Sequence, residues 1–296
     1  GTAGGDGSLL DYRSLTLDKV EGGVGTDPIG QAGKLVVAQT DAGAWTTVTF
    51  DQPLDNPSVV LGPLSFNDAD PATLRVRDVT DTGFQFQIDE WDYLDGIHGA
   101  ETIQWLALEQ GVHEVGGQTI AAGSSTASGN GSLIQLEGTS FGSAPVVLAQ
   151  IASDNGAAAA TAQIESVSNG SFRLDLDREE AASSAHGTEQ VDWIAVTPGG
   201  DGSDGLQAGS VTRVQDGGKT ISLMNGDTDE FVFLSSMQGE RIRDAATVRL
   251  ESQTDDSWRV FIEEEQSLDA ETSHGNEKVG YLGIELGLIY ADDLLA

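Results

Sequence analysis

A histidine and a glutamate three residues apart recur three times in this chain, as His98 with Glu101, His186 with Glu189, and His274 with Glu277. Imidazole nitrogens and carboxylate oxygens are common ligands of transition metals, so each pair is a candidate metal site. A complete zinc site needs further ligands, and side chains three residues apart in a strand point to opposite faces unless the strand bends. The alternative is a structural pair, in which a buried imidazole hydrogen-bonds to the carboxylate or to the backbone and holds the loop before a strand.

The spacing of these pairs reveals an internal repeat. Consecutive pairs lie 88 residues apart, and each is followed by an apolar segment that begins with an aromatic residue: Trp105, Trp193 or Tyr281. Each copy also opens with a glycine shortly before an apolar residue, at Gly33, Gly117 and Gly209. A fixed period of this kind is typical of a repeat architecture. We therefore predict a Gly/Asp-rich lead-in (1–32), three copies (33–111, 117–199 and 209–287) joined by linkers at 112–116 and 200–208, and a tail (288–296).

Each copy has the pattern of an antiparallel β-sandwich. Apolar residues alternate with polar ones over short runs, as at Phe84, Phe86 and Ile88, and the runs are separated by turns rich in Gly, Asp, Asn and Pro. About six strands per copy follow, and no segment shows sustained helical periodicity. The sequence predicts an all-β fold of three tandem six-stranded modules, with the aromatic residues of the last strands at equivalent inward or interface positions.

The charge of the chain excludes some classes of partner. There are 14 basic and 48 acidic residues, which give a formal net charge of −34. Such a chain does not bind nucleic acid by neutralising phosphates, and anionic membranes repel it. We expect no membrane insertion, because no run approaches the ~18–20 apolar residues of a spanning helix. An acidic, Lys-poor surface suits a protein of a high-salt or marine environment, where salt screens the self-repulsion. The alternatives are an ordinary acidic secreted protein and one loaded with Ca²⁺.

No cofactor is certain from the sequence, but Ca²⁺ is a candidate. Calcium prefers oxygen ligands, and several loops carry closely spaced aspartates. These pairs are Asp68 with Asp70, Asp92 with Asp95, Asp227 with Asp229, and Asp255 with Asp256. None forms an EF-hand loop, and a charged loop is more often simply solvated. The chain has no cysteine, nucleophile elbow or Gly-rich phosphate loop, so we do not expect an enzyme.

The first copy resembles the H-type lectin family, to which snail agglutinin and the C-terminal domain of discoidin belong. The resemblance rests on the order and spacing of Gly33, Asp41-Ala42-Gly43, Trp45, Phe50, the segment 57–61, Arg75, Thr82-Gly83-Phe84, Trp91 and Trp105-Leu106-Ala107. It covers about 80 residues per copy and most of the chain. It implies a six-stranded antiparallel sandwich that binds galactose or N-acetylgalactosamine between the protomers of a trimer.

The resemblance also implies a sugar site in the first copy. The family's Arg and Trp fall on Arg75 and Trp91, Asp92 takes the place of the His that follows this Trp in the snail protein, and Asp41 is a candidate acidic ligand. An aromatic ring covers the apolar face of a galactose-type sugar, while Arg and a carboxylate bind its hydroxyls. The second copy has Gln163 and Glu179 at the Arg and Trp positions, and the third has Arg249 and Glu265. Sugar binding is therefore expected in the first copy alone.

Two functions of different classes remain open. One is a carbohydrate-binding adhesion protein of the extracellular space, a cell surface or a virion, with a glycan as its partner. The other is a structural module of a fibre, spike or appendage that has lost sugar binding. Because the resembled lectins are trimers of one domain, we expect the three copies to close as an intrachain pseudo-trimer. The alternatives are beads on a string and a homo-oligomer in which copies of different chains associate.

Overall fold

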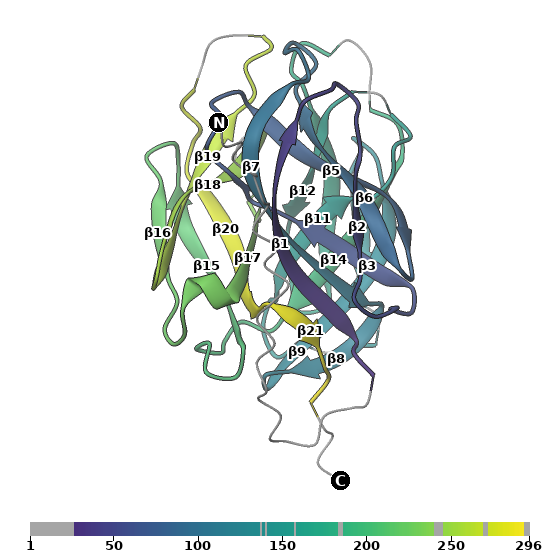
Figure 1. Cartoon of the computed structure of the whole chain (residues 1–296), viewed down its shortest axis with the longest axis vertical. Helices are drawn as coiled ribbons and strands as arrows, with labels where there is room; N and C mark the ends of the chain where they lie inside the picture. Colours follow the sequence, from purple (N-terminus) through teal and green to yellow (C-terminus); the bar gives the residue numbers. More distant parts are fainter. Residues whose placement is uncertain are drawn as a thin grey trace, which may run out of the picture.

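The computed structural model describes residues 27–136, 138–139, 141–156, 158–182, 186–239, 245–268 and 272–292. These residues form an all-β fold of several small antiparallel sheets, as expected (Figure 1). In this part of the chain no helix has the length and apolar character needed to cross a membrane.

The first module consists of two three-stranded sheets that face each other. Its strands are β1 (Gly30–Gln39), β2 (Thr46–Thr49), β3 (Pro57–Leu61), β5 (Ala72–Thr80), β6 (Gly83–Glu90) and β7 (His98–Glu109). The inner sheet has the order β1-β7-β3 and the outer sheet the order β2-β6-β5. Alternate residues of both sheets, such as Phe84, Phe86 and Trp105, are buried between them. The alternation in the sequence therefore marks the sandwich core.

The same strand order occurs twice more along the chain. The second set is β9 (Gln118–Ala127), β10 (Ser132–Gln135), β11 (Val146–Ile151), β12 (Ala160–Glu165), β13 (Ser171–Arg178) and β14 (Glu189–Val196). The third is β15 (Leu206–Val214), β16 (Lys219–Ser222), β17 (Phe231–Met237), β18 (Ala246–Thr254), β19 (Ser257–Glu264) and β20 (Glu277–Glu285), with a 3-10 turn, η2, at Thr228–Glu230. The inner sheets are β9-β14-β11 and β15-β20-β17, and the outer sheets are β10-β13-β12 and β16-β19-β18.

A glycine lies opposite the aromatic residue of each last strand. Gly33 pairs with Trp105, and a Cβ at Gly33 would come within 2.4 Å of the indole ring. In the second module the residue paired with Trp193 is Gly123, where a Cβ would again lie 2.4 Å from the ring. Gly117, the glycine expected from the sequence, instead lies in the turn before β9, with φ +71°. The repeat requires glycine where a ring lies flat across the neighbouring strand.

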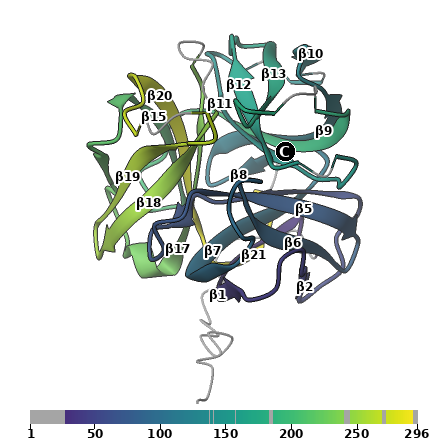
Figure 2. The ribbon, with the colours of Figure 1, turned by 90° about the horizontal axis from the view of Figure 1, so that it is seen from above.

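The three inner sheets share one hydrophobic core. The faces that turn away from the sandwich interiors contribute to a single buried cluster, in which Leu106, Ile194 and Leu282 from the three last strands take part. Figure 2 shows the three lobes arranged around this common centre. The modules are thus parts of one packed unit.

The segments that follow the modules close the arrangement into a ring. Residues 111–115, most of which were expected to be a linker, form β8 (Gly111–Val115), which pairs with β9. After the second module, Gly199 pairs with Ala208 at the start of β15. After the third, β21 (Gly287–Ile289) pairs with β1, so residues 288 and 289 of the expected tail are part of a sheet (Figure 1). The first strand also begins at Gly30, inside the expected lead-in. Each module therefore adds a short strand or bridge to the first strand of the next.

The shared core predicts cooperative unfolding of all three modules. Leu106 is fully buried in this core, so Leu106→Ala should lower the free energy of unfolding by about 2–5 kcal/mol and shift one common transition. Denaturant titration in high salt, followed by tryptophan fluorescence and circular dichroism, measures both effects. Leu133→Ala is the control, because Leu133 is 58% exposed and its truncation should change stability by no more than ~0.5 kcal/mol. Separate transitions, of which Leu106→Ala moves only one, would contradict the shared core.

Candidate functional site

Arg75, the proposed sugar ligand on β5, is buried against the second module. Its Nη2 lies 2.9 Å from Glu189 Oε1, and its Nε donates to the carbonyl oxygen of Ser153 at 3.3 Å. The side chain also lies 3.5 Å from Asp89 of its own module. Only 3% of Arg75 is exposed, so its donors bind the neighbouring module and do not face solvent.

Trp91, the proposed stacking platform, is also buried. It is 1% exposed and packs with Ala159 of the second module and Ala245 of the third. Neither ring face is therefore open to a sugar in this structure. The two acidic candidates, Asp92 and Asp41, are both exposed; Asp92 Oδ1 accepts a hydrogen bond from Ala159 N at 3.3 Å, and Asp41 lies in the turn between β1 and β2. The four residues do not form one open pocket in this structure, and the sugar site stays a prediction from the resemblance.

The first His–Glu pair forms because a β-bulge brings both side chains to one side. Gln39 pairs with His98 and Val37 with Glu101, so three steps on β7 face two steps on β1. His98 Nε2 then lies 3.4 Å from Glu101 Oε1, while its Nδ1 lies 3.0 Å from Glu90 Oε1 at the end of β6. All three side chains are buried. In a regular strand His98 and Glu101 would point to opposite faces, and the bulge interrupts this alternation.

The Glu101 carboxylate is saturated with donors. It accepts hydrogen bonds from the Ser65 hydroxyl, from Asn67 N at 3.0 Å and from Asp68 N at 2.9 Å. Arg249 of the third module adds a contact of 3.2 Å from its Nη2. Arg249 is fully buried, and it also donates to the Ser65 carbonyl oxygen, where β4 (Leu64–Ser65) runs parallel to β18. This network joins the third module to the first.

Equivalent contacts join the other modules. In the second module His186 Nε2 lies 2.9 Å from Glu189 Oε1, and Glu189 receives Arg75 of the first module. In the third, His274 lies 2.7 Å from Glu264 Oε1 and 3.4 Å from Glu277 Oε1. Here Gln163 replaces the arginine and donates to the carbonyl oxygen of Gly239 at 2.8 Å. The three contacts run from the first module to the second, the second to the third and the third to the first.

Burial and hydrogen bonds act in opposite directions on the pKa values of these buried groups. Burial lowers the pKa of His98, but the hydrogen bonds with Glu101 and Glu90 outweigh burial and raise that pKa above its ordinary value. The pKa of His274 is raised in the same way by Glu277 and Glu264. For Glu101, burial raises the pKa, but His98, Ser65 and two backbone N–H groups lower it below its ordinary value. Each buried imidazole already contacts one or two carboxylates, so the geometry supports the structural alternative.

The described residues contain no cluster of three or more His, Asp or Glu side chains arranged to hold a metal ion. Some aspartates of the candidate Ca²⁺ loops bind neighbouring donors instead. Asp68 Oδ2 accepts a hydrogen bond from Gly99 N at 2.7 Å, and Asp227 Oδ1 accepts one from Asp229 N at 3.0 Å. These carboxylates fix the conformation of their own loops.

A second set of polar contacts satisfies the edge strands of the inner sheets. Asp192 of β14 accepts a hydrogen bond from Val59 N at 2.9 Å, and Gln104 of β7 accepts one from Phe233 N at 2.8 Å. Gln238 donates to the carbonyl oxygen of Val147 at 2.7 Å. Each of these bonds crosses between modules. Sequence reasoning missed these residues, because an isolated polar residue in a strand does not show which module its side chain faces.

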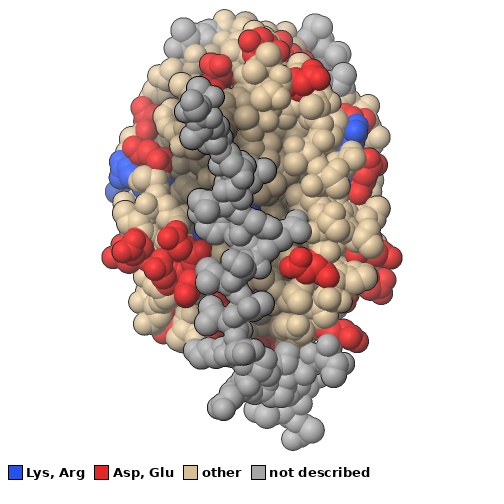
Figure 3. All heavy atoms as spheres, in the orientation of Figure 1, with Lys and Arg blue, Asp and Glu red and all other residues tan. Residues whose placement is uncertain are grey.

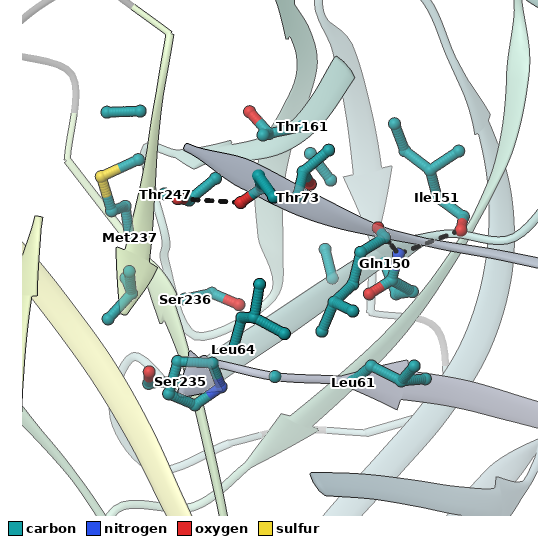
Figure 4. A pocket seen from close by; sticks show the side chains of 18 of the residues that line it. Leu61, Leu64, Thr73, Gln150, Ile151, Thr161, Ser235, Ser236, Met237 and Thr247 are labelled. Carbon is teal, nitrogen blue, oxygen red and sulfur yellow. Dashed lines mark hydrogen bonds between the residues drawn. The ribbon is translucent and has the colours of Figure 1, made fainter. Parts of the chain in front are cut away.

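A cavity lies where the three modules meet (Figure 4). Its walls include three equivalent threonines, Thr73, Thr161 and Thr247, together with Gln150 and Ser235. Its volume is ≈ 90 Å³, well below the roughly 300–1,000 Å³ of typical ligand pockets. The hydroxyls of Thr161 and Ser235 have no hydrogen-bond partner among the described residues. The space suits a few ordered waters and is too small to enclose a sugar.

The buried arginine predicts a large stability effect. Arg249→Met leaves Glu101 and Glu263 without their guanidinium partner, and loss of one member of a buried ion pair costs about 3–5 kcal/mol. Arg259→Met is the matched control, because Arg259 and its partner Glu251 are partly exposed and such a pair contributes about 0–1 kcal/mol. Chemical denaturation in high salt compares the two variants. Equal losses would show that Arg249 does not anchor the module interface.

Stability should also fall as the pH rises from about 4 to about 7. Burial raises the pKa of Asp192 to about 6 and that of Glu263 to about 7, so the folded state holds protons that the unfolded state releases near pH 4. Stability from these groups is present at low pH and is lost as the pH rises through the folded pKa values. The raised pKa values of His98 and His274 act in the same direction above about pH 6.5.

Thermal unfolding at fixed high salt measures this pH profile. Asp192→Asn can keep an acceptor for Val59 N and removes the titration, so its profile should be flatter by about 1–3 kcal/mol between pH 4 and pH 7. The exposed Asp41→Asn makes the same change in formal charge and should keep the slope. A slope that is unchanged in Asp192→Asn would show that this buried carboxyl does not couple folding to pH.

Comparisons with known proteins include a match to part of a longer protein. No family model and no solved structure matches the chain. A protein named halomucin, from Haloquadratum walsbyi (strain DSM 16790 / HBSQ001), is 26% identical over 297 residues. The similarity covers 88% of this chain but 3% of halomucin. The chain is therefore similar to a small segment of a much longer protein.

Proposed function

We propose that this chain is a structural module of an extracellular or cell-surface protein in a high-salt environment. The observation that carries the proposal is the burial of Arg75 and Trp91, on which a lectin site would depend. Both side chains connect modules within the chain. The proposed role is to provide a rigid, closed unit within a larger surface structure.

The charge of the molecule supports a high-salt setting. The net charge is −34, and the face in Figure 3 carries many acidic and few basic side chains. Salt screens the repulsion among these carboxylates, so the folded state should tolerate strong brine better than dilute buffer. The name of the relative, halomucin, supports a location outside the cell.

The alternative is a carbohydrate-binding adhesion protein. A sugar would then have to bind outside the residues that the lectin resemblance implies, because the small cavity and the buried Trp91 do not accommodate it. Trp45 is half-buried, and the guanidinium of Arg77 lies 4.0 Å from its ring centroid, so one face of that ring is covered as well. The geometry therefore favours the structural role.

A glycan array in high salt tests the choice between these functions. The chain should not bind galactose or N-acetylgalactosamine above background. Trp91→Ala should lower the free energy of unfolding by about 3–5 kcal/mol, since it removes a buried ring. Trp45→Ala should cost less, because Trp45 is only half-buried. Galactose binding that Trp91→Ala abolishes in a folded protein would overturn the structural proposal.

Location is tested separately on intact cells of the natural source. An antibody raised against the purified chain should label these cells without permeabilisation. Labelling that requires permeabilised cells would contradict the extracellular setting.

A further inference from the structure

We infer that the second module carries N-linked glycans at Asn130 and Asn169. Two tripeptides have the acceptor pattern Asn-x-Ser with x other than Pro: Asn130-Gly131-Ser132 and Asn169-Gly170-Ser171. This pattern marks the asparagine amide as an acceptor of glycans in exported proteins, provided that the residue lies at the surface. The inference goes beyond the proposed structural role but rests on its extracellular setting.

Asn169 lies at the tip of a β-hairpin. Ser168 N donates to the carbonyl oxygen of Ser171 at 2.8 Å, which leaves Asn169 and Gly170 as the two residues of the turn between β12 and β13. Asn169 is exposed, and a Cβ placed at Gly170 would meet nothing within 4 Å. Both the acceptor and the middle residue of the tripeptide are therefore open to an enzyme.

Asn130 lies in a second exposed turn, directly before β10. Its N–H donates to the carbonyl oxygen of Ser128 at 2.7 Å, and Gly131 follows with φ +67°. The side chain of Asn130 is exposed. Since β10 and β13 are antiparallel neighbours, the two tripeptides start from opposite ends of the same strand pair. Both glycans would project from the outer sheet of the second module, away from the shared core.

The other asparagines provide internal contrasts. Asn56 has a serine two residues later, but the middle residue is Pro57, and Ser58 is fully buried. Proline at this position excludes the acceptor pattern. Asn67, Asn155, Asn225 and Asn276 have no Ser or Thr two residues later. Modification should therefore be confined to the second module.

The equivalent hairpin tips of the other modules are acidic. The turn between β5 and β6 has Asp81 and Thr82, and the turn between β18 and β19 has Asp255 and Asp256. The second module thus has a neutral acceptor where its neighbours carry charge. A glycan is a bulky, hydrated group, so it would keep this tip soluble without a carboxylate.

The reaction needs a donor that the chain does not supply. That donor is an oligosaccharide linked through its anomeric carbon to a polyisoprenyl phosphate or diphosphate, used by a membrane-bound oligosaccharyltransferase. The asparagine Nδ2 attacks the anomeric carbon, and a C–N bond forms as the bond from that carbon to the phosphate oxygen breaks. The lipid phosphate leaves with the bonding electron pair, and the amide loses one proton. No oxidant or reductant is required.

The test is the mass of the full 296-residue chain after secretion from a halophilic archaeal host that performs N-glycosylation. Intact mass spectrometry should show glycan increments, and fragmentation of peptides should place them on Asn130 and Asn169 and not on Asn56. Asn130→Gln and Asn169→Gln should each remove one increment. Ser171→Ala should remove the increment at Asn169 although the asparagine remains, whereas Ser171→Thr should keep it.

The experiment distinguishes a failure of the glycosylation inference from a failure of the proposed extracellular location. A secreted, folded chain with unmodified peptides at both asparagines would overturn this inference and leave the structural proposal intact. An increment that survives both Asn→Gln changes would also overturn it, since the sugar would then lie elsewhere. Export in this assay comes from an added signal sequence, so the labelling of intact source cells remains the independent test of location.

Discussion

The fold depends on the fact that each inner sheet has two apolar faces. Along β7, Trp105 and Ala107 point into the sandwich, while Leu106 and Leu108 point the other way into the shared core. One module alone would expose that second face to water, which is unfavourable by about 25 cal/mol for each Å² of apolar surface. Three modules together bury it. The burial of these faces therefore requires the ring of three modules.

Burial of the inner faces determines the polar contacts at the module boundaries. Edge strands and loops that enter these boundaries lose their water, so their polar groups need partners. Asp192 and Gln104 supply acceptors to backbone N–H groups of the adjacent modules, and Arg249 supplies donors to Glu101. The pattern is not strictly symmetric: where Gln163 replaces the arginine, Gly239 also replaces the serine found at Ser65 and Ser153. At the boundary between the second and third modules, both contacting residues therefore differ from those at the other two boundaries.

The sequence was sufficient to predict the repeat, the strand-rich fold and the inward position of the last-strand aromatics, because these follow from spacing and alternation. It was insufficient for Arg75 and Trp91. An Arg and a Trp at these positions give the same sequence pattern whether they contact a sugar or another module, because their surroundings depend on how the modules pack. The β-bulge near His98 and Glu101 could not be predicted from the alternation of residues in a strand. One extra residue on β7 changes the face to which the following side chains point. The coupled change of Gln163 and Gly239 was the signal in the internal repeats that could have indicated an interface.

The pairing of β21 with β1 has a mechanical consequence. Gly30 lies opposite Ile289, so the chain enters and leaves the ring at neighbouring points on one end of an antiparallel pair. A tensile load applied through residues 29 and 290 would pull these two strands apart in sequence, one hydrogen bond after another, and would not shear them along their length. The pair is only three residues long, from Gly30–Ile289 to Ala32–Gly287. Under tension the ring would therefore open first at this junction, releasing length while the six sheets of the modules stay folded.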